Sequence, residues 1–369
     1  MGIPQFKKEV KEIDMKSRIY VCHTYYHALI AIVKELVVYK DSRGEATLIL
    51  SKMSNDFGKL DERMRKSGLF EELLMYDEKP DTAFEELNKY RKDTGNIVTN
   101  MWNRIIFTKK FGKLLETDIP VDFKQYKDIY VFCDSDPIGF YLSYKRIYYH
   151  AVEDGLDTLR LSDQARITNK GHFGIKAWMA AHNLIFIENG YSKYCLDMEV
   201  NDISECPHPL PNFVEVSRND LFDKLTEEDK RLLITLFIEK LPELEEQIHN
   251  APAELPKYLI LTEPLCELDV RERLFRDVID EYCQGAVAVI KPHPRDVLDY
   301  KKLFPEVIVI EGKFPMEILN YIPRMTFDKV ISVLTVPGSI KFSGDVVFLG
   351  LDFMDRYEDP EIHRANELI

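Results

Sequence analysis

The sequence predicts an α/β protein in which two Rossmann-like domains face each other across a cleft. Residues 257–349 alternate short apolar strands with helical patterns, which is typical of a parallel sheet with right-handed crossovers. Residues 18–39 open in the same way, as a strand, a loop and an amphipathic helix, although without a glycine fingerprint. Between these units, Pro207, Pro209 and Pro211 mark a linker. We therefore expect an N-terminal domain at 1–200, a proline-rich and helical connection at 201–256, and a C-terminal domain at 257–369.

The composition is that of a globular protein with room for two cores. The chain has 369 residues, of which 45% are hydrophobic, and its net charge is −14. That charge excludes non-specific nucleic-acid binding through the overall field, so we expect no nucleic-acid partner. The six cysteines form no Cys-x-x-Cys pair, which indicates reduced core thiols in the cytoplasm. No run approaches the roughly 20 apolar residues of a membrane span, and no secretory segment follows the mixed-charge residues 1–16.

The elements of the first half follow from short runs of apolar and β-branched residues alternating with helical periodicity. Residues 96–107 fit a helix or a strand equally well, as do residues 141–149. A turn is expected at Asn189-Gly190. The predicted strands are 18–22, 47–51, 72–76, 128–133 and 184–188. One predicted helix follows the first strand and ends near residue 39, and two more lie near 57–67 and 81–92.

In the second half, residues 218–249 are predicted to be helical. Thr226 followed by three acidic residues is a strong helix start, because the hydroxyl caps the first turn and the acids complement the helix dipole. Strands are predicted at 258–262, 286–290, 307–311, 329–333 and 346–349, and helices at 270–284, 297–303 and 315–321.

Residues 286–296 are the most informative stretch. A buried strand ends where Pro292 and Pro294 begin, because proline cannot donate to a sheet ladder. His293 is therefore held at the carboxyl end of a core strand, where ligands bind in open α/β sheets, with Lys291 and Arg295 beside it. A histidine among cations suits an anionic group such as phosphate. The same residues also fit a surface turn whose histidine has no role.

Acidic residues near predicted strand ends are candidates for a general base. Glu153-Asp154-Gly155 places carboxylates where the chain can turn, although solvated acids in a polar turn explain the pattern equally simply. Asp269, in the loop after strand 258–262, is a second candidate. Asp134-Ser135-Asp136 matches the DxD metal motif only superficially, and we interpret it as a strand-end turn. His23 and His27 border the same edge, but no third ligand for zinc is evident.

Three consecutive strand ends of the C-terminal unit could serve one nucleotide. Gly312 lies at one of them, and Glu317 in the next helix start could bind a ribose diol or merely complement the helix dipole. The next strand ends in hydroxyls that could hold phosphate or serve as ordinary caps. These hydroxyl residues are Ser332, Thr335 and Ser339.

These motifs together resemble the bacterial sialyltransferases. Glu153-Asp154-Gly155, Pro292-His293-Pro294, Glu317 and Thr335 follow the order of that group's (D/E)(D/E)G, HP and Ser/Thr motifs. The opening strand with its His-Thr-Tyr-Tyr-His and the run 261–265 are most similar to glycosyltransferase family 52, the lipooligosaccharide sialyltransferases. The resemblance spans residues 18–350 and implies the GT-B type of glycosyltransferase fold. Some periplasmic binding proteins share that architecture, but they need an export signal.

The resemblance also implies roles for individual residues. His293 would protonate or stabilise departing CMP, and Asp154, or else Asp269, would activate the acceptor hydroxyl. Glu317 would hold the cytidine ribose, and Thr335 with Ser332 or Ser339 would contact the phosphate. Leucine precedes Thr335 where related families show a hydroxyl pair. Lys291, Pro294 and Gly312 complete the expected donor site, which needs no cofactor or metal because phosphate is already a fair leaving group.

The implied activity is an inverting transfer of sialic acid from CMP-sialic acid to a galactose-ended glycan of lipooligosaccharide or capsule. The partners would be this donor and acceptor, in a cytoplasmic homodimer held at the inner membrane face. One alternative is another nucleotide-sugar transferase, for instance one that uses a UDP-hexose, because similar strand ends could bind a uridine nucleotide. A non-catalytic nucleotide- or sugar-binding protein of the same fold is the other alternative.

Overall fold

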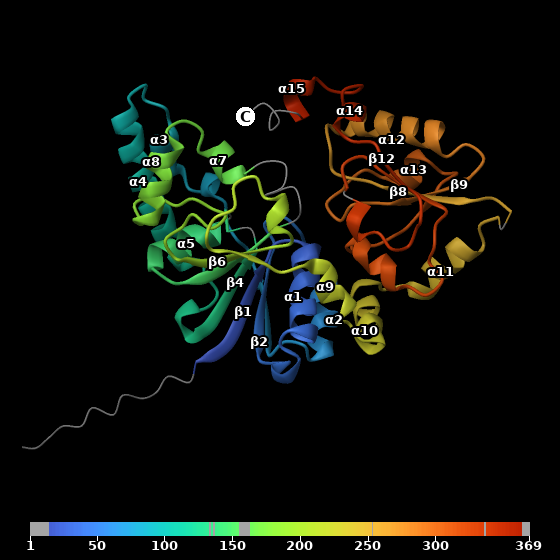
Figure 1. Cartoon of the computed structure of the whole chain (residues 1–369), viewed down its shortest axis with the longest axis horizontal. Helices are drawn as coiled ribbons and strands as arrows, with labels where there is room; N and C mark the ends of the chain where they lie inside the picture. The colour runs from blue at the N-terminus through green and yellow to red at the C-terminus, as the bar shows by residue number, and fades with distance from the viewer. Residues whose placement is uncertain are drawn as a thin grey trace, which may run out of the picture.

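The computed structural model describes residues 15–132, 134–135, 137–154, 163–252, 254–335 and 337–363. Two sheets dominate it, one of seven strands in the order β3-β2-β1-β4-β5-β6-β7 and one of five in the order β10-β9-β8-β11-β12. Every strand pairing is parallel. Figure 1 shows the two sheets in separate halves of the molecule, each with helices packed on it. The predicted fold class is confirmed.

The first sheet is built around β1, whose register places Ile19 between Thr47 and Ile129. Alternate residues of β1 enter different cores, since Tyr20 packs on the side of α1 whereas Ile19 packs on the opposite face. The strands are β1 (Lys16–Cys22), β2 (Ala46–Ser51), β3 (Glu72–Tyr76), β4 (Tyr126–Phe132), β5 (Tyr149–Val152), β6 (Cys195–Val200) and β7 (Phe213–Glu215). The helices are α1 (Tyr25–Val37), α2 (Leu60–Ser67), α3 (Asn88–Arg91), α4 (Ile97–Leu114), α5 (Pro137–Lys145), α7 (Gln164–Thr168) and α8 (Phe173–Ala181).

The prediction of a strand at 184–188 is wrong. Those residues are irregular, although Ile185, Phe186 and Ile187 are buried, so the apolar run reflects burial without ladder pairing. The strand lies further on, at β6. The expected helix at 81–92 is broken into two 3₁₀ turns and the short α3. The two ambiguous segments are resolved as the helix α4 and as α5 followed by β5.

The connection is helical as predicted and contains three helices, namely α9 (Arg218–Asp223), α10 (Glu227–Phe237) and α11 (Leu241–His249). Thr226 and Asp229 form a capping box at the start of α10, as the sequence indicates. The helix α10 contacts α2 of the first domain and residues 316–321 of the second. One apolar core therefore runs through both domains and the connection. The expected domain limits stay a prediction, although β7 adds residues 213–215 to the first sheet.

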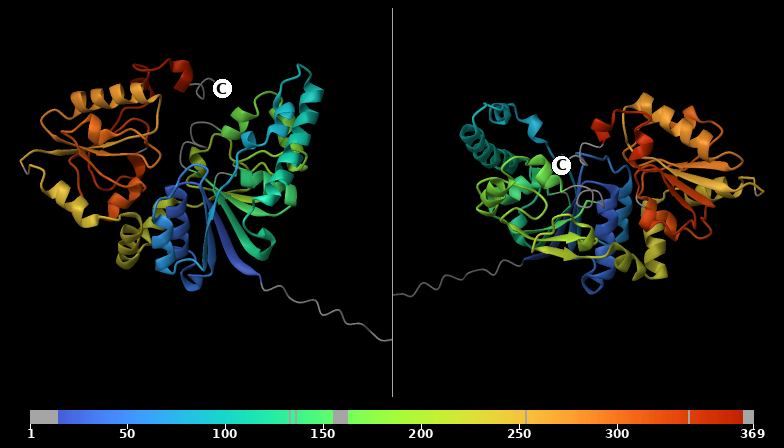
Figure 2. Two further views of the ribbon diagram at one scale, coloured as in Figure 1. Left: turned by 180° about the vertical axis from the view of Figure 1, so that it is seen from behind. Right: turned by 45° about the horizontal axis from the view of Figure 1, so that its top comes forward.

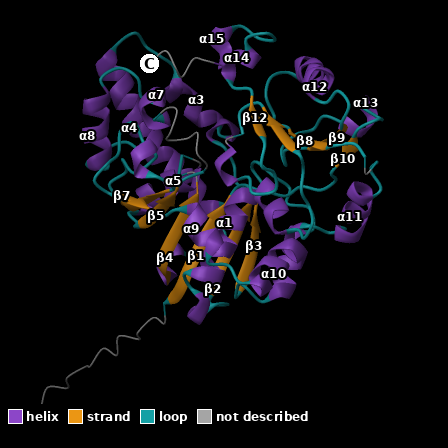
Figure 3. Cartoon of the chain, turned by 45° about the vertical axis from the view of Figure 1, so that its right-hand side comes forward, coloured by secondary structure: helices purple, strands orange, loops and turns teal. Residues whose placement is uncertain are grey.

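The second sheet reverses its strand order at β8 and β11, so a ligand crevice is expected outside the carboxyl ends of these strands. Figures 2 and 3 show this sheet opposite the first one. Its strands are β8 (Lys257–Leu261), β9 (Val287–Lys291), β10 (Ile308–Val309), β11 (Lys329–Ser332) and β12 (Val346–Phe348). Its helices are α12 (Leu268–Tyr282), α13 (Tyr300–Leu303), α14 (Leu351–Met354) and α15 (Pro360–His363), and the 3₁₀ helix η7 (Met316–Tyr321) stands where a helix is predicted.

The remaining 3₁₀ helices are η1 (Lys40–Ser42), η2 (Asp81–Ala83), η3 (Glu85–Leu87), η4 (Leu115–Thr117), η5 (Phe123–Gln125), η6 (Ile203–Glu205) and η8 (Pro337–Ser339). Within the described ranges, no helix has the length and apolar character that crossing a membrane requires.

Candidate active site

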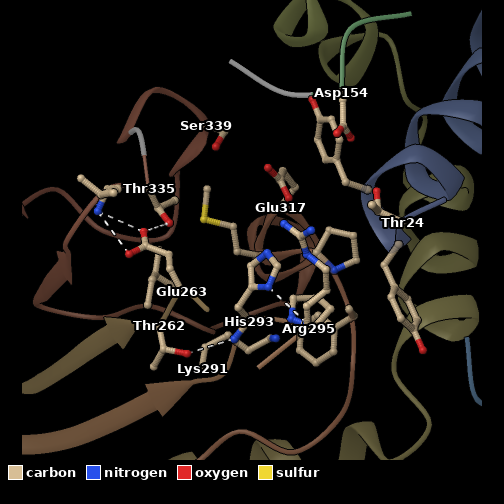
Figure 4. Close-up of a pocket in the computed structure, with 18 of the residues that line it drawn as sticks. Thr24, Asp154, Thr262, Glu263, Lys291, His293, Arg295, Glu317, Thr335 and Ser339 are labelled. Carbon is tan, nitrogen blue, oxygen red and sulfur yellow. Dashed lines mark hydrogen bonds between the residues drawn. The ribbon is translucent and has the colours of Figure 1, made fainter. Parts of the chain in front are cut away.

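A cavity of about 620 Å³ lies between the two domains. The N-terminal wall contains Thr24, Tyr26 and Asp154, and the C-terminal wall contains His293 and Glu317 (Figure 4). A volume of this size suits a nucleotide-sized ligand. The sequence places these residues at strand ends, and the parallel sheets bring those ends together.

His293 is fixed by its own loop. Its backbone N–H donates to Thr262 Oγ1 at 3.1 Å, and the backbone N–H of Arg295 donates to His293 Nδ1 at 3.1 Å. Because Nδ1 accepts, the proton of the neutral ring is on Nε2. Burial, together with Arg295 and Lys291, lowers the pKa of His293 to about 4. At neutral pH the imidazole is therefore uncharged and offers Nε2–H as a donor.

Lys291 lines the same side of the cavity. Its Nζ donates to the carbonyl oxygen of Pro292 at 2.7 Å and lies 4.2 Å from the ring centroid of Phe314. Burial lowers the pKa of Lys291 to about 7, because the charged ammonium is poorly solvated there. Glu317 is nearby and also buried, which raises its pKa, whereas Lys291 and a hydrogen bond from Ser339 act in the other direction. An anion in the cavity would stabilise the charged form of Lys291.

Glu263, to which the sequence analysis gives no role, holds the loop that follows β11. Thr335 Oγ1 and the backbone N–H of Leu334 both donate to its carboxylate, the latter at 3.1 Å. Thr335 and Ser339 line the cavity, and Pro294 does as well. Ser332 is buried beneath them and donates to the Thr335 carbonyl oxygen at 2.6 Å, so it supports the loop without lining the cavity.

Asp154 is held by a buried histidine. His27 Nε2 hydrogen-bonds Asp154 Oδ1, and His27 Nδ1 accepts from the backbone N–H of His23 at 3.0 Å. Nδ1 is thus an acceptor, so the proton lies on Nε2 and is donated to the carboxylate. Burial lowers the pKa of His27, and Asp154 offsets part of this effect. The two residues are 127 positions apart in the sequence, and only the fold pairs them.

Two predicted residues lie away from this cavity. Asp269 is exposed in the first turn of α12 and does not line it. Gly312 has a φ of 104° and lies with Lys313 in a neighbouring cavity of about 330 Å³. Gly155 lies outside the described residues.

Asp134 of the DxD-like stretch is a buried structural residue. Its carboxylate accepts from the Tyr149 hydroxyl and from the backbone N–H of Asn189, each at 2.9 Å. Burial raises the pKa of Asp134 to about 6. Asp136 lies outside the described residues. The described ranges contain no group of three or more His, Cys, Asp or Glu side chains suited to a metal ion.

Arg218, at the start of α9, is a cavity residue that the sequence reading did not single out. It is 6% exposed, and its Nη2 is buried without a hydrogen-bond partner among the described residues. Its Nη1 donates weakly to the Val216 carbonyl oxygen at 3.4 Å. The Tyr26 side chain hydrogen-bonds the guanidinium, and Arg218 offsets part of the burial that raises the pKa of Glu153, whose carboxylate also accepts from the backbone N–H of Asn201 at 2.7 Å. A buried guanidinium with spare donors is suited to a planar anion such as a carboxylate.

Comparisons with known proteins identify a family for most of the chain. Residues 70–335 match glycosyltransferase family 52. An uncharacterised protein of Haemophilus influenzae is 26% identical over 196 residues, which is 52% of this chain and only 58% of that relative's length.

Solved structures show a similar fold. An α/β-galactoside α-2,3-sialyltransferase of Photobacterium phosphoreum is 14% identical, with 90% of each chain covered and a TM-score of 0.50. A 2,6-sialyltransferase of Photobacterium sp. JT-ISH-224, solved with CMP and lactose, is 11% identical, with 90% of this chain and 71% of that chain covered and a TM-score of 0.52. At these identities the likeness concerns the fold alone.

Proposed function

The chain belongs to glycosyltransferase family 52, and from that premise we propose that it is an inverting, metal-independent sialyltransferase. The donor would be CMP-sialic acid and the acceptor a galactose-ended glycan of lipooligosaccharide or capsule. One observation carries the proposal: a carboxylate and an imidazole, Asp154 and His293, line one cavity from opposite domains. An inverting transfer requires this arrangement, because the acceptor hydroxyl attacks one face of the donor sugar while the nucleotide departs from the opposite face.

In the proposed reaction, the acceptor hydroxyl loses its proton to the Asp154 carboxylate, and its oxygen attacks the anomeric carbon of the donor sugar. The bond from that carbon to the phosphate oxygen breaks through an oxocarbenium-like state, and CMP departs. The hydrogen bond from His27 keeps the carboxylate oriented. Asp269 is the weaker candidate for the base because it lies outside the cavity.

His293 would act on the leaving group. In the free protein its ring is neutral at pH 7 and presents Nε2–H. Negative charge on a bound donor would raise its pKa, so the ring would take up a proton from solvent and give it to the phosphate oxygen as the bond breaks. Lys291, Thr335 and Ser339 would surround the phosphate, and Glu317 would accept hydrogen bonds from the ribose.

Arg218 supports an anionic sugar rather than a neutral hexose. Sialic acid carries a carboxylate on its anomeric carbon, and Arg218 has a buried Nη2 without a partner among the described residues. A charge-assisted pair with that carboxylate would satisfy the guanidinium. A hexose donor offers no such group, and the buried donor would then stay unpaired at a cost.

The testing experiment is a thermal-shift titration with CMP, UDP, GDP and ADP in the presence of EDTA. A ligand at 100 times its dissociation constant stabilises the folded state by about 2.7 kcal/mol, which this method resolves. We expect stabilisation by CMP alone. Selective stabilisation by UDP would favour a hexosyltransferase, and no stabilisation by any of them would overturn the assignment of the C-terminal site.

We also propose that the enzyme works at the cytoplasmic face of the inner membrane as a homodimer. The dimer would use the connection, whose helix α10 buries one face in the shared core and leaves the other face exposed. Sedimentation velocity of the full chain over a range of concentrations tests this, and a monomer at all concentrations would exclude the dimer.

A further inference from the structure

Two neighbouring helices of the N-terminal domain, α4 and α8, expose apolar side chains to solvent. Both tryptophans of the chain lie here, Trp102 on α4 and Trp178 on α8, and they are 63% and 57% exposed. Figures 1 and 2 show the two helices side by side on the part of this domain that is remote from the C-terminal domain. The residues that share this exposure are Ile97, Val98, Trp102, Ile175 and Trp178, and we name them the tryptophan patch.

The patch is not a loosely packed core. The inner sides of the two helices are joined by Met101 and Ile105 of α4, which pack against Met179 and Ala180 of α8. Arg104 on α4 also hydrogen-bonds the Asn169 side chain, just before α8. The helices are therefore joined through these side chains, and the residues of the tryptophan patch are apolar side chains of the same two helices that this packing leaves exposed.

The charge around the patch is opposite to that of the whole protein. Residues 94–115 and 164–187 contain seven lysines and arginines and none of the 63 acidic residues of the chain. An acid directly flanks each end of the two ranges, namely Asp93, Glu116, Asp163 and Glu188, so the excess over 93–116 and 163–188 is three positive charges. Asp163 pairs with Arg166 at 3.0 Å, Glu86 lies 3.8 Å from Lys110, and the Asp93 carboxylate accepts from the Asn100 side chain at 2.6 Å. Lys170 is exposed and makes no ion pair within the described ranges. The region remains basic in a protein with a net charge of −14.

We propose that the tryptophan patch docks on the surface of an anionic phospholipid bilayer. Tryptophan is favoured at the membrane–water interface, where its apolar ring and its polar N–H are both accommodated. Lysines and arginines beside it are attracted to anionic headgroups. A second copy of the chain fits less well, because a two-fold interface would place this basic region against itself. The patch thus combines the two features that a peripheral membrane contact requires.

The tryptophan patch lies on the domain that carries the proposed base, an inference that rests on the proposed function. The helices α7 and α8 follow Asp154 in the chain, so the docked domain is the one that carries the proposed base. Docking through this domain leaves the C-terminal domain away from the bilayer, free to exchange nucleotides. The acceptor class is accordingly a glycan whose lipid part stays in the membrane.

Co-sedimentation of the full-length protein with vesicles tests the proposal. Vesicles of phosphatidylethanolamine with phosphatidylglycerol are compared with vesicles of phosphatidylcholine alone, at low and high salt. We expect binding only to the anionic vesicles, and weaker binding in high salt. Trp102→Ala combined with Trp178→Ala should lower the partition coefficient at least about tenfold, because two large apolar side chains no longer enter the interface. Lys170→Glu should lower it by about fivefold or more.

The matched control combines Tyr148→Ala with Phe348→Ala, which removes aromatic side chains of similar exposure elsewhere on the surface. This control should bind vesicles as the unmodified protein does, and all variants should keep their melting temperature. Equal binding by the tryptophan double variant, or none by the unmodified protein, would overturn the proposal. A concentration-dependent dimer that only the tryptophan variant loses would assign the patch to self-association instead.

Turnover with a soluble galactoside separates this inference from the proposed function. The tryptophan double variant should transfer sialic acid to lactose at the normal rate and lose activity only toward acceptor lipid in vesicles. If the unmodified protein binds vesicles but transfers nothing to either acceptor, the proposed function fails while the docking surface stands.

Discussion

The two walls of the cleft hold their ionisable groups in different ways. Near the N-terminal wall, three buried side chains each have a carboxylate partner: His27 contacts Asp154, His23 lies 2.7 Å from Glu78, and Lys34 lies 2.5 Å from Glu199. These carboxylates offset part of the burial that lowers the pKa values of His27 and Lys34. On the C-terminal wall, His293 and Lys291 lie near Arg295, and among the described residues neither has a carboxylate at hydrogen-bond distance. Burial lowers both of their pKa values. The N-terminal wall is therefore arranged before any substrate binds, whereas the C-terminal wall is completed by an anion. The comparison leads to five predictions.

The largest expected effect comes from the C-terminal wall. His293→Ala should lower kcat by roughly 10²–10⁴-fold, because the leaving phosphate loses its proton donor. Steady-state kinetics with CMP-sialic acid measure this, and circular dichroism should show an unchanged fold. An undiminished kcat would show that the histidine has no part in the reaction.

On the N-terminal wall, Asp154→Asn should lower kcat by about 10²–10⁴-fold with little change in CMP affinity. Asp269→Asn is its matched control, since that carboxylate is exposed and away from the cavity, and it should keep a near-normal rate. The reverse pattern would transfer the role of the base to Asp269.

Arg218 tests whether the cleft recognises an anionic sugar. Arg218→Met should weaken binding of CMP-3-fluoro-sialic acid by about 10- to 100-fold, because one charge-assisted pair contributes on the order of 1.5–3 kcal/mol. Affinity for CMP alone should not change, and calorimetric titration of both ligands measures the difference. An equal loss for both ligands would point to a general effect on the cleft.

Substitutions of His27 test whether its hydrogen bond positions Asp154 before substrate binds. His27→Phe keeps an aromatic ring beside Phe132 but removes the donor to Asp154, and we expect kcat to fall about tenfold, as one lost hydrogen bond of this kind implies. His27→Gln can donate from a similar position and should recover much of that loss. CMP affinity should be unchanged in both variants. If both lose activity equally, His27 acts only through packing.

The smallest expected effect is the pH dependence of stability. The pKa of His293 is about 4 in the folded protein and ordinarily near 6.5, so the unfolded chain binds the extra proton first as pH falls. The stabilising contribution is present above pH 6.5 and is lost between about pH 6.5 and 4, by on the order of 3 kcal/mol in all, of which about 2 kcal/mol is lost by pH 5. His293→Gln should lack this component when urea unfolding is compared at pH 7 and pH 5. The same slope in both proteins would assign the titration to other groups.

How much of this was predictable depends on the range of the interactions involved. The strand β9 and its proline-flanked histidine are local, so the sequence indicates both of them. The strand β6 was missed because Asp197 and Glu199 interrupt its apolar pattern, and the partner that allows Glu199 to be buried, Lys34, lies 165 residues away. The pairing of His27 with Asp154 is equally distant in the chain.

The local pattern assigned no role to some of the site residues. Glu263 and Arg218 become recognisable only when the fold shows what surrounds them, a pair of loop donors for one and a buried unpaired Nη2 for the other. Conversely, Gly312 stands at a strand end as predicted but faces a neighbouring cavity. A strand end is assigned by pattern, whereas the direction of a side chain depends on the loop that follows.

The apolar core that runs through both domains by way of α10 has a consequence for folding. Because the two sheets share one contiguous set of buried side chains, neither half can melt without exposing apolar surface of the other. The two halves are accordingly coupled through this shared core, so a cavity made within it weakens both of them.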